Sequence, residues 1–377
     1  MDNMKKLLYI STIEDGPYQG VRKKISMQCK AFEELGLDVT YINSGKRTFW
    51  GQIEKLLPTC YGVNYRIIKK RIIEFDKQHF DYCYVRYSPA SRGLIDILKT
   101  LRNTQNEIKI VLEIPTYPYE DELRSLKSKP FKFRDRLFRN KLKEYVDLVI
   151  TPSHLDEDTV FGIPAFEITN GIDVKSVRIK NSSNKHGNII NLIGVALITD
   201  KQGYDRVIRG ISTYEKTKED NDPSVCFYII GTGNCKHELE ELCDRLSIKD
   251  CVVFTGEKDN EQLDYYYDIA DCGVGTLGLY KTNELLKVNS LKTREYCAKG
   301  LPFVIADCDY MFAENNFEFC MVVNNDDAEV DIRAVIHFIN SLKQKYSNDE
   351  IAIKMNTFAN DNLSWSRILE QVLKKVQ

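Results

Sequence analysis

The chain has 377 residues, of which 43% are hydrophobic and 29% charged, and its formal net charge is −2. This length exceeds one ordinary hydrophobic core and suits two domains of a soluble globular protein. No apolar run approaches the roughly 20 residues that span a bilayer. The amino-terminal run Met4–Ser11 is too short for the core of a signal peptide, so we expect it to form the first strand of a domain.

The cysteines and histidines give no metal-binding pattern. The 11 cysteines include no C-x-x-C pair, and the five histidines lack ligand spacing. This usage is typical of reduced, buried thiols in the cytosol rather than of a disulfide framework or a zinc site. We therefore expect a cytoplasmic protein without a metal.

Charge is distributed unevenly along the chain. Residues 1–165 hold 28 Lys and Arg against 22 Asp and Glu, whereas the remainder holds 25 against 33. The segment Lys127–Lys143 interleaves cations with aromatic residues. Such a segment can lie on an anionic membrane surface, where each cation contributes about 1 kcal/mol; the alternative is a solvated helix face. The slightly acidic chain argues against nucleic-acid binding.

Strands and helices alternate through the first half of the chain. The loop Glu14–Gly20 leads to a helix that ends near Gly36, and the region Phe49–Gln78 is expected to be largely helical. The predicted strands are Lys6–Ser11, Val39–Asn43, Tyr82–Arg86, Lys109–Glu113 and Leu148–Thr151. This alternation predicts a parallel sheet covered on both faces.

The second half repeats this plan. The predicted strands are Ile189–Gly194, Cys226–Ile230, Val252–Thr255, Cys272–Thr276 and Phe303–Ala306. The predicted helices include Tyr204–Tyr214, Lys236–Leu246, Gln262–Ala270 and the amphipathic tail Trp365–Val376. The chain therefore predicts two Rossmann-like domains with a cleft between them, and ligands in such sheets bind beyond the carboxyl ends of the strands.

The segment Ser290–Ile305 predicts a helix followed by a buried strand. Ser290 is a favourable N-cap whose hydroxyl can accept a bond from a first-turn amide, and Gly300 with Pro302 predicts the helix end. A helix amino terminus that follows a strand and a loop favours anions through its amides and dipole. Glu295, one turn inside, is placed to reach a hydroxyl beside that anion. Phosphate next to a diol describes a nucleotide, whereas the alternative is an ordinary helix–strand unit that binds nothing.

Other short motifs are weaker. Gly231-x-Gly233 lacks the third glycine of a dinucleotide fingerprint, and a tight turn is the better explanation. The chain contains no G-x-x-x-x-G-K-[ST], H-E-x-x-H or G-x-S-x-G, which argues against a P-loop NTPase, a zincin and an α/β-hydrolase.

Five segments occur in a fixed order between residues 165 and 310. They are Thr169–Asp173 (N-G-[IV]-D), Ile193–Ala196 through Gly203–Arg206 (a first strand and helix), Ile229–Gly233 (I-x-G-x-G), Val253–Gly256 (V-x-F-x-G) and Ser290–Pro302 (P-L-K-x-x-E-Y-x-A-x-G-x-P). Together they resemble the retaining GT-B glycosyltransferases of family 4, especially the bacterial enzymes of exopolysaccharide and capsule clusters. In residues 1–165 the resemblance is architectural.

The resemblance implies an α/β fold of two Rossmann-like domains (GT-B) facing across a cleft, with the C-terminal helix returning to the first domain. The acceptor-binding domain would comprise residues 1–165 with 360–377, and the donor-binding domain residues 166–359. Three positions depart from the family pattern: Lys287 stands where a Glu is usual, Val195 replaces the Arg after Gly194, and Gln202 separates Lys201 from Gly203.

The implied reaction moves a sugar from a UDP- or GDP-linked donor to an acceptor hydroxyl, with retention and without a metal. The leaving diphosphate gains charge, which cations and amides must stabilise. Glu295 is expected to bind the ribose hydroxyls. The candidate catalytic residues are Glu113, Lys201 and Arg206. The candidate donor-binding residues are Gly16, Gly20, Gly194, Gly231, Gly233, Gly256, Ser290, Leu291, Lys292 and Glu295.

Several alternatives stay open at this stage. Glu113 could brace its loop instead of facing a substrate, Arg206 could be an ion-pair partner on a helix surface or between domains, and Glu295 could be a solvated carboxylate. The chain could also be a nucleotide-sugar 2-epimerase of the same fold, or a non-catalytic GT-B-like partner. We expect a glycan or lipid-linked acceptor in surface-glycan synthesis, with the protein in the cytoplasm or peripheral on the inner face of the membrane.

Overall fold

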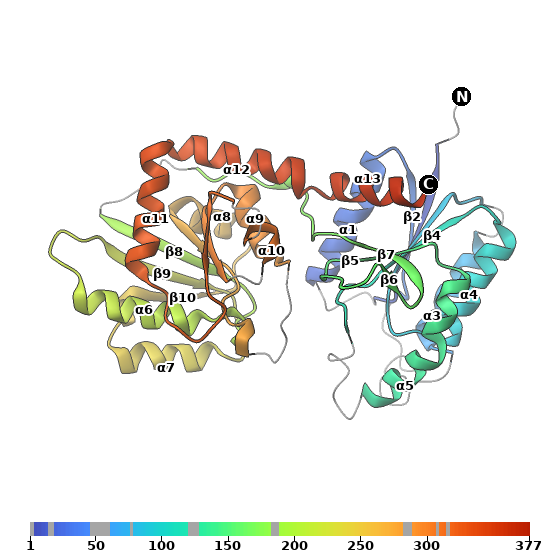
Figure 1. The fold of residues 1–377 in the computed structure, drawn as a ribbon, viewed down its shortest axis with the longest axis horizontal. Coiled ribbons are helices and arrows are strands. Elements are labelled where there is room, and N and C mark those ends of the chain that lie inside the picture. The colour runs from blue at the N-terminus through green and yellow to red at the C-terminus, as the bar shows by residue number, and fades with distance from the viewer. Residues whose placement is uncertain are drawn as a thin grey trace. The chain divides into compact units, whose positions relative to one another are not determined.

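The computed structural model describes residues 4–13, 19–45, 61–75, 78–119, 128–181, 188–281, 289–306, 309–313 and 317–377. The chain divides into two compact units, one of Met1–Thr169 with Trp365–Gln377 and one of Asn170–Ser364. Each unit contains a sheet with helices on both faces (Figure 1). The predicted α/β fold with two parallel-sheet domains is confirmed.

The sheet of the first unit has the strand order β2-β1-β3-β4-β5-β7-β6. All neighbours pair in parallel except β6 and β7. The strands are β1 (Lys6–Ile10), β2 (Asp38–Ile42), β3 (Tyr82–Arg86), β4 (Lys109–Glu113), β5 (Leu148–Thr151), β6 (Thr159–Val160) and β7 (Ile163–Glu167).

Alternate residues of these strands pack against helices on opposite faces, because successive side chains in a strand point to opposite sides. One face carries α1 (Gln19–Glu34) and α13 (Trp365–Val376), where Tyr9 and Tyr84 pack against Phe32 and Leu369. The other face carries α3 (Val63–Glu74) and α4 (Arg92–Thr104). Because α13 belongs to this core, the expected return of the last helix to the first domain is confirmed.

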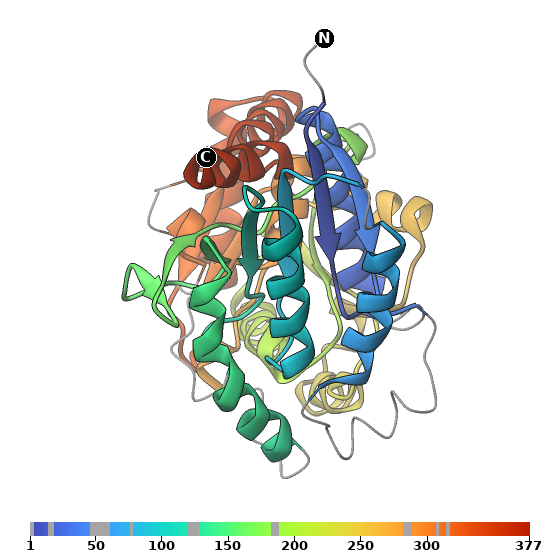
Figure 2. The ribbon, with the colours of Figure 1, turned by 90° about the vertical axis from the view of Figure 1, so that its right-hand side faces the viewer.

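The helix α5 (Lys129–Phe138) and the 3-10 helix η2 (Arg139–Glu144) follow one another along the chain. Figures 1 and 2 show α5 at the rim of the first unit.

The sheet of the second unit has the strand order β10-β9-β8-β11-β12-β13, and every pair is parallel. Numbered along the unit, this is the order 3-2-1-4-5-6 of dinucleotide-binding Rossmann sheets. The strands are β8 (Ile189–Val195), β9 (Ser224–Ile230), β10 (Val252–Gly256), β11 (Cys272–Val274), β12 (Phe303–Ala306) and β13 (Cys320–Val323).

Helices cover both faces of this sheet. The core on one face includes residues of α6 (Tyr204–Thr217), α7 (Lys236–Leu246) and α11 (Ile332–Lys345). The core on the other includes residues of α8 (Asn260–Ile269), α9 (Leu291–Lys299), α10 (Tyr310–Ala313) and α12 (Asn348–Asn362). Short 3-10 turns η3 (Val174–Ser176), η4 (Asp200–Gln202), η5 (Lys249–Cys251) and η6 (Leu279–Lys281) complete the unit.

The observed elements differ from the predicted ones in a few places. Within Phe49–Gln78 the structure places α3 at Val63–Glu74, and residues 46–60 lie outside the described residues. The first helix begins at Gln19, so Gly20 belongs to α1 and not to the preceding loop. Gly16 and Lys287 also lie outside the described residues. The short strands β6, β7 and β13 and the helices α10 to α12 had not been predicted.

Candidate functional site

The strand order of the second sheet reverses direction between β8 and β11, which lie side by side. In open parallel sheets the loops that leave such a switch point diverge and form the ligand site. Here these loops are joined by backbone bonds from Leu277 N to Gln202 O (3.1 Å) and from Gly278 N to Lys201 O (3.1 Å). Gly203 adopts φ 62°, and a Cβ there would lie 2.6 Å from Gly278 N, so only glycine fits this contact.

The predicted Gly231–Gly233 turn packs against the loop after β8. Gly231 has φ 131°, and a Cβ there would lie 1.9 Å from Ala196 O. A Cβ on Gly233 would lie 2.0 Å from Ile198 O. Gly231 N also donates to Gly256 O (3.0 Å), which fixes the end of β10. These glycines therefore bring three strand ends together at one edge of the sheet, and Gly194 similarly leaves room for the Tyr204 ring.

The helix α9 begins at this edge with Ser290 at its N-cap and ends at Gly300 in the left-handed conformation, as predicted. The Ser290 hydroxyl makes no capping bond, so the predicted cap interaction is wrong. Instead, Thr293 Oγ1 donates to Ser290 O (2.8 Å). The Ser290 side chain thus caps none of the first-turn amides, which is the arrangement that suits an anion.

A buried ionic cluster fixes where α9 begins. The Arg294 guanidinium is fully buried and its Nη1 lies 2.7 and 2.9 Å from the two carboxylate oxygens of Asp309. The Nη2 atom of Arg294 donates to Asn289 Oδ1 (2.6 Å), and the side-chain amide of Asn170 donates to Asn289 O (2.8 Å). The first turn of α9 is therefore held to the strand end after β12 and to the start of the second unit.

Lys292 bridges the two loops of the switch point. Its ammonium donates to Gln202 Oε1 and to Gly275 O (2.8 Å), and it lies 5.2 Å from the centre of the Tyr204 ring. The Tyr204 hydroxyl is buried and has no hydrogen-bond partner among the described residues. Burial, with Tyr296 nearby, raises the pKa of Tyr204 well above its usual value. Lys292 and Tyr204 therefore place an ammonium group and a neutral phenol close to the start of α9.

Glu295 and Lys201 complete this edge. Glu295 is half-buried, one turn into α9. Burial and the Glu295 charge raise the pKa of Tyr267, although the Tyr267 hydroxyl forms no hydrogen bond of normal geometry. Lys201 is exposed on η4 without an ion pair among the described residues, and Leu291 is 42% exposed at the first position of α9. The edge thus offers helix amides, two lysines and one carboxylate, a set that suits a diphosphate and a ribose.

Arg206 is buried within the second unit. It lies neither on a helix surface nor at a domain boundary, the two alternatives considered from the sequence. It is 1% exposed, and its guanidinium donates to Leu277 O (2.8 Å) and Ala328 O (2.5 Å) and pairs with Asp326 (3.3 Å). These bonds tie α6 to the loop after β11 and to the segment after β13. This geometry favours a structural role for Arg206.

Glu113 is likewise fully buried, at the end of β4 in the first unit. Its carboxylate pairs with Lys24 (2.8 Å) and Arg86 (3.1 Å) and accepts from Gln28 (3.1 Å) and Tyr84 (2.7 Å). Burial raises the pKa of Glu113, but these cations and hydrogen bonds outweigh burial and lower the pKa to about 2.

Burial in turn lowers the pKa of Lys24, against the attraction of Glu113. We regard Glu113 and Lys24 as a charged pair, because Arg86 and the neutral donors Gln28 and Tyr84 stabilise the Glu113 carboxylate independently of Lys24. The Lys24 ammonium also lies 5.2 Å from the centre of the Trp365 ring. The cluster therefore joins α1, β3, β4 and α13, which favours the bracing role for Glu113 over a substrate contact.

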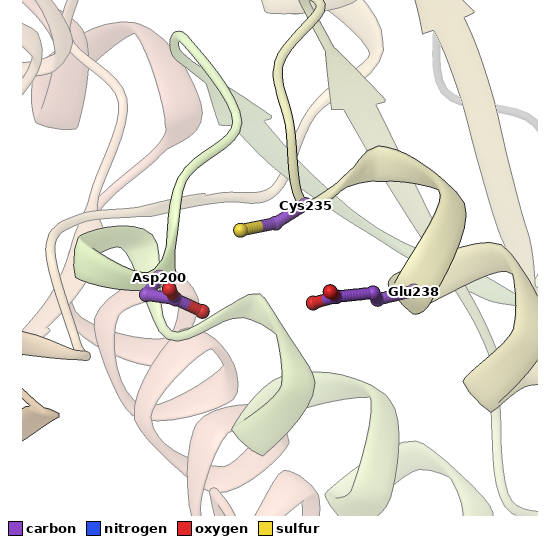
Figure 3. Close-up of side chains that lie close together, drawn as sticks. All are labelled: Asp200, Cys235 and Glu238. Carbon is purple, nitrogen blue, oxygen red and sulfur yellow. The ribbon is translucent and has the colours of Figure 1, made fainter.

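A further group of side chains lies in the segments that follow β8 and β9 in the second unit. Asp200, Cys235 and Glu238 hold ligand atoms within 4.8 Å of one another, and Figure 3 shows the three groups pointing toward one another. Thiol and carboxylate ligands could hold a divalent cation such as Zn²⁺. Burial, followed by Asp200 and Glu238, raises the pKa of the Cys235 thiol, so a metal would have to displace its proton. Cysteine and histidine spacing could not reveal this group, because Asp200 is brought to it by tertiary folding.

Residues 175–348, just under half of the chain, match a protein family described as "Glycosyl transferases group 1". This range holds the Gly194, Gly231, Gly256 and α9 regions of the candidate site. No curated protein sequence matches the chain significantly.

Several solved structures share the fold. A glycosyltransferase from Rickettsia africae covers 99% of this chain and 97% of its own at 12% identity, with a TM-score of 0.64. Anabaena HepE in complex with UDP covers 98% of both chains at 13% identity, with a TM-score of 0.62. WaaG, a glycosyltransferase involved in lipopolysaccharide biosynthesis, covers 98% of this chain and 99% of its own at 12% identity, with a TM-score of 0.56. The chain therefore has the GT-B fold along nearly its whole length.

Proposed function

We propose that this protein is a glycosyltransferase that moves a sugar from a nucleoside diphosphate sugar to an acceptor hydroxyl. The observation that carries the proposal is the start of α9 at the switch point, where Ser290 leaves the first-turn amides without a side-chain cap beside Lys292 and Glu295. The family match over residues 175–348 supports the same assignment. In this proposal the second unit binds the donor and the first binds the acceptor.

The proposed roles follow from charge and position. The amides of α9, with Lys292 and Lys201, neutralise the diphosphate as it gains charge on leaving. Glu295 accepts hydrogen bonds from the ribose hydroxyls, which a carboxylate does with charge assistance. Arg206 and Glu113 are assigned to positioning, since both are buried and engaged within their own units. The UDP complex of HepE supports UDP as one donor nucleotide to test, with GDP as the other.

We further propose that transfer proceeds with retention and without a metal, in the synthesis of a bacterial surface glycan. The family 4 resemblance of Ser290–Pro302 supports retention, and the lysines at the switch point support neutralisation of the diphosphate by protein cations. The lipopolysaccharide role of WaaG supports the glycan class. Within the described part of the chain, none of the helices combines the length and apolar character needed to cross a bilayer. A lipid-linked acceptor would then be met by peripheral contact at the cytosolic face.

The test is a screen of the purified full chain against UDP- and GDP-sugars by thermal shift, followed by product analysis. A ligand at about 100 times its Kd adds about 2.7 kcal/mol to the free energy of unfolding, which is readily measured. A glycosyltransferase should consume the stabilising donor and release the nucleoside diphosphate only when an acceptor or water takes the sugar. Conversion of the nucleotide sugar alone into its 2-epimer would instead identify the epimerase. If no nucleotide or nucleotide sugar changes the melting temperature, the protein would be identified as a non-catalytic GT-B-like protein.

A further inference from the structure

The helix α5 buries two charged side chains and exposes two apolar ones. Arg134 is 7% exposed and Asp135 1%, whereas Phe133 is 67% exposed and Leu137 50%. Phe133 and Leu137 are four residues apart, so they lie on one face of the helix. A surface helix of a globular protein normally has the opposite pattern. The outer face of α5, defined as Lys129, Phe133 and Leu137 together with Lys141 of η2, therefore calls for an environment that is partly apolar.

Contacts on the inner side fix this orientation. The Asp135 carboxylate accepts from Tyr87 Oη (2.5 Å), Tyr119 Oη (2.6 Å) and Ala90 N (2.7 Å). Arg139 pairs with the same carboxylate (3.6 Å). A buried carboxylate with this many partners is costly to displace, since its buried donors would be left without an acceptor. The helix cannot roll to hide Phe133 and Leu137 without breaking these bonds.

The charge around the outer face is strongly positive. Residues 129–144 contain seven Lys and Arg and two acids, the buried Asp135 and the exposed Glu144. Lys129, Lys141 and Lys143 are exposed at the two ends of the segment. The acids Glu120, Asp121 and Glu122 precede the segment in sequence and lie outside the described residues. Two apolar side chains framed by lysines match an anionic lipid surface, where rings and alkyl groups enter the acyl boundary and ammonium groups meet phosphates.

We propose that the outer face of α5 docks the first unit on an anionic bilayer, with Phe133 and Leu137 inserted and Lys129, Lys141 and Lys143 at the headgroups. A second copy of the same face is disfavoured as the partner, because it would bring two basic clusters together. The proposal deepens the proposed function, since it supplies the surface on which a lipid-linked acceptor would be met. Its test uses no donor or acceptor and therefore fails or succeeds independently of transferase activity.

The experiment measures binding of the full chain to phosphatidylcholine vesicles with and without phosphatidylglycerol, by sedimentation across a salt series. The wild type should bind the anionic vesicles at low salt and release as salt rises, because screening weakens surface attraction. Phe133→Ser with Leu137→Ser should reduce binding roughly tenfold or more, because two inserted apolar side chains are lost. The matched control is Ile73→Ser, which removes an apolar side chain that is 57% exposed on α3, and should leave binding unchanged.

A charge variant separates the two contributions. The combined changes Lys129→Gln, Lys141→Gln and Lys143→Gln should weaken binding at low salt and flatten its salt dependence. Arg134 and Arg139 are left intact because both face the inner contacts of α5. Thermal melting of each variant should match the wild type, since every substituted side chain is exposed. The proposal is overturned if the wild type does not bind the anionic vesicles at low salt, if it binds zwitterionic vesicles equally well, or if the Phe133 and Leu137 variant binds as tightly as the wild type.

Discussion

The ammonium group of Lys292 on α9 donates to the side-chain oxygen of Gln202, in the loop that leaves the second sheet after β8. A second bond to Gly275 O (2.8 Å) holds the same ammonium on the β11 side. A flexible lysine is thereby fixed beside the first turn of α9. Gln202 is one of the positions where the chain differs from the family 4 pattern that it resembles. This residue therefore contacts Lys292, a proposed donor-binding residue.

Substitution of Gln202 tests this relationship. We expect Gln202→Ala to weaken binding of a nucleoside diphosphate about threefold to tenfold, because Lys292 loses a charge-assisted bond that orders it. Gln202→Glu should weaken binding further, since a carboxylate would neutralise Lys292 and repel the diphosphate. Isothermal titration with UDP and GDP measures both effects. Unchanged affinity in the Glu variant would remove Lys292 from the diphosphate site.

Glu295→Ala should weaken nucleotide binding more than it destabilises the fold. Loss of charge-assisted hydrogen bonds to ribose is expected to cost about 1.5–3 kcal/mol of binding free energy. The change in the free energy of unfolding should stay within ~0.5 kcal/mol, which is the usual effect of a surface substitution. Glu241→Ala, an exposed carboxylate on α7, is the matched control and should alter neither quantity. Wild-type affinity in the Glu295 variant would assign that carboxylate to the solvent instead.

Two glycines at the same edge should respond differently to alanine. Gly231→Ala places a Cβ 1.9 Å from Ala196 O at φ 131°, so the loop after β8 must move, and we expect the loss of several kcal/mol of stability together with nucleotide binding. Gly256→Ala meets no atom within 4 Å and carries only the strain of φ 72°, which costs about 1–2 kcal/mol. Thermal melting and UDP titration of the pair separate loop displacement from strain. Equal behaviour of the two variants would contradict the packing argument.

Most strands were predictable because they are short apolar runs ended by turn residues. Tyr82–Arg86, Lys109–Glu113 and Phe303–Ala306 were predicted with the bounds that the structure gives. The strand β7 was missed because Pro164 interrupts its pattern, and proline argues against a strand unless it lies near an edge. Here β7 lies next to the edge strand β6, which pairs with it in an antiparallel ladder. Tertiary position, and not local propensity, made that segment a strand.

The candidate site was predictable where it is local in sequence, and not where it is assembled by folding. The bounds of α9 between Ser290 and Gly300 were predicted from residue types and are confirmed, although the Ser290 hydroxyl makes no capping bond. Burial and pairing of Glu113 and Arg206 could not be read from the sequence, because their partners lie 27 to 122 residues away in the chain. The Arg294–Asp309 pair spans only 15 residues, but it was missed because it needs the segment after β12 to lie beside α9.

Nucleotide binding should not depend on a metal. We expect the affinity for UDP or GDP to be the same in EDTA and in Mg²⁺ or Mn²⁺, because helix amides and lysines supply the charge at the start of α9. The Asp200, Cys235 and Glu238 group provides the control for this prediction. Mn²⁺ or Zn²⁺ bound by this group could raise the affinity for UDP or GDP. In that case the double variant Cys235→Ser with Asp200→Asn should abolish the increase. Strict dependence on added metal in the wild type would contradict the proposed diphosphate site.

Glu113 should control the acid stability of the first unit. Its folded pKa of about 2 lies below the ordinary value of 4.5, so the group contributes stability that is present above about pH 5 and lost as the pH falls toward 2. Glu113→Ala should cost about 3–5 kcal/mol at pH 7, because Lys24 and Arg86 are left buried without their partner. Glu113→Gln keeps the shape and should flatten the fall in stability between about pH 5 and 2. Urea denaturation across this range measures both, with the exposed Glu33→Gln as the control expected to follow the wild type. A Gln variant with the wild-type pH dependence would show that the carboxylate is not charged in the folded protein.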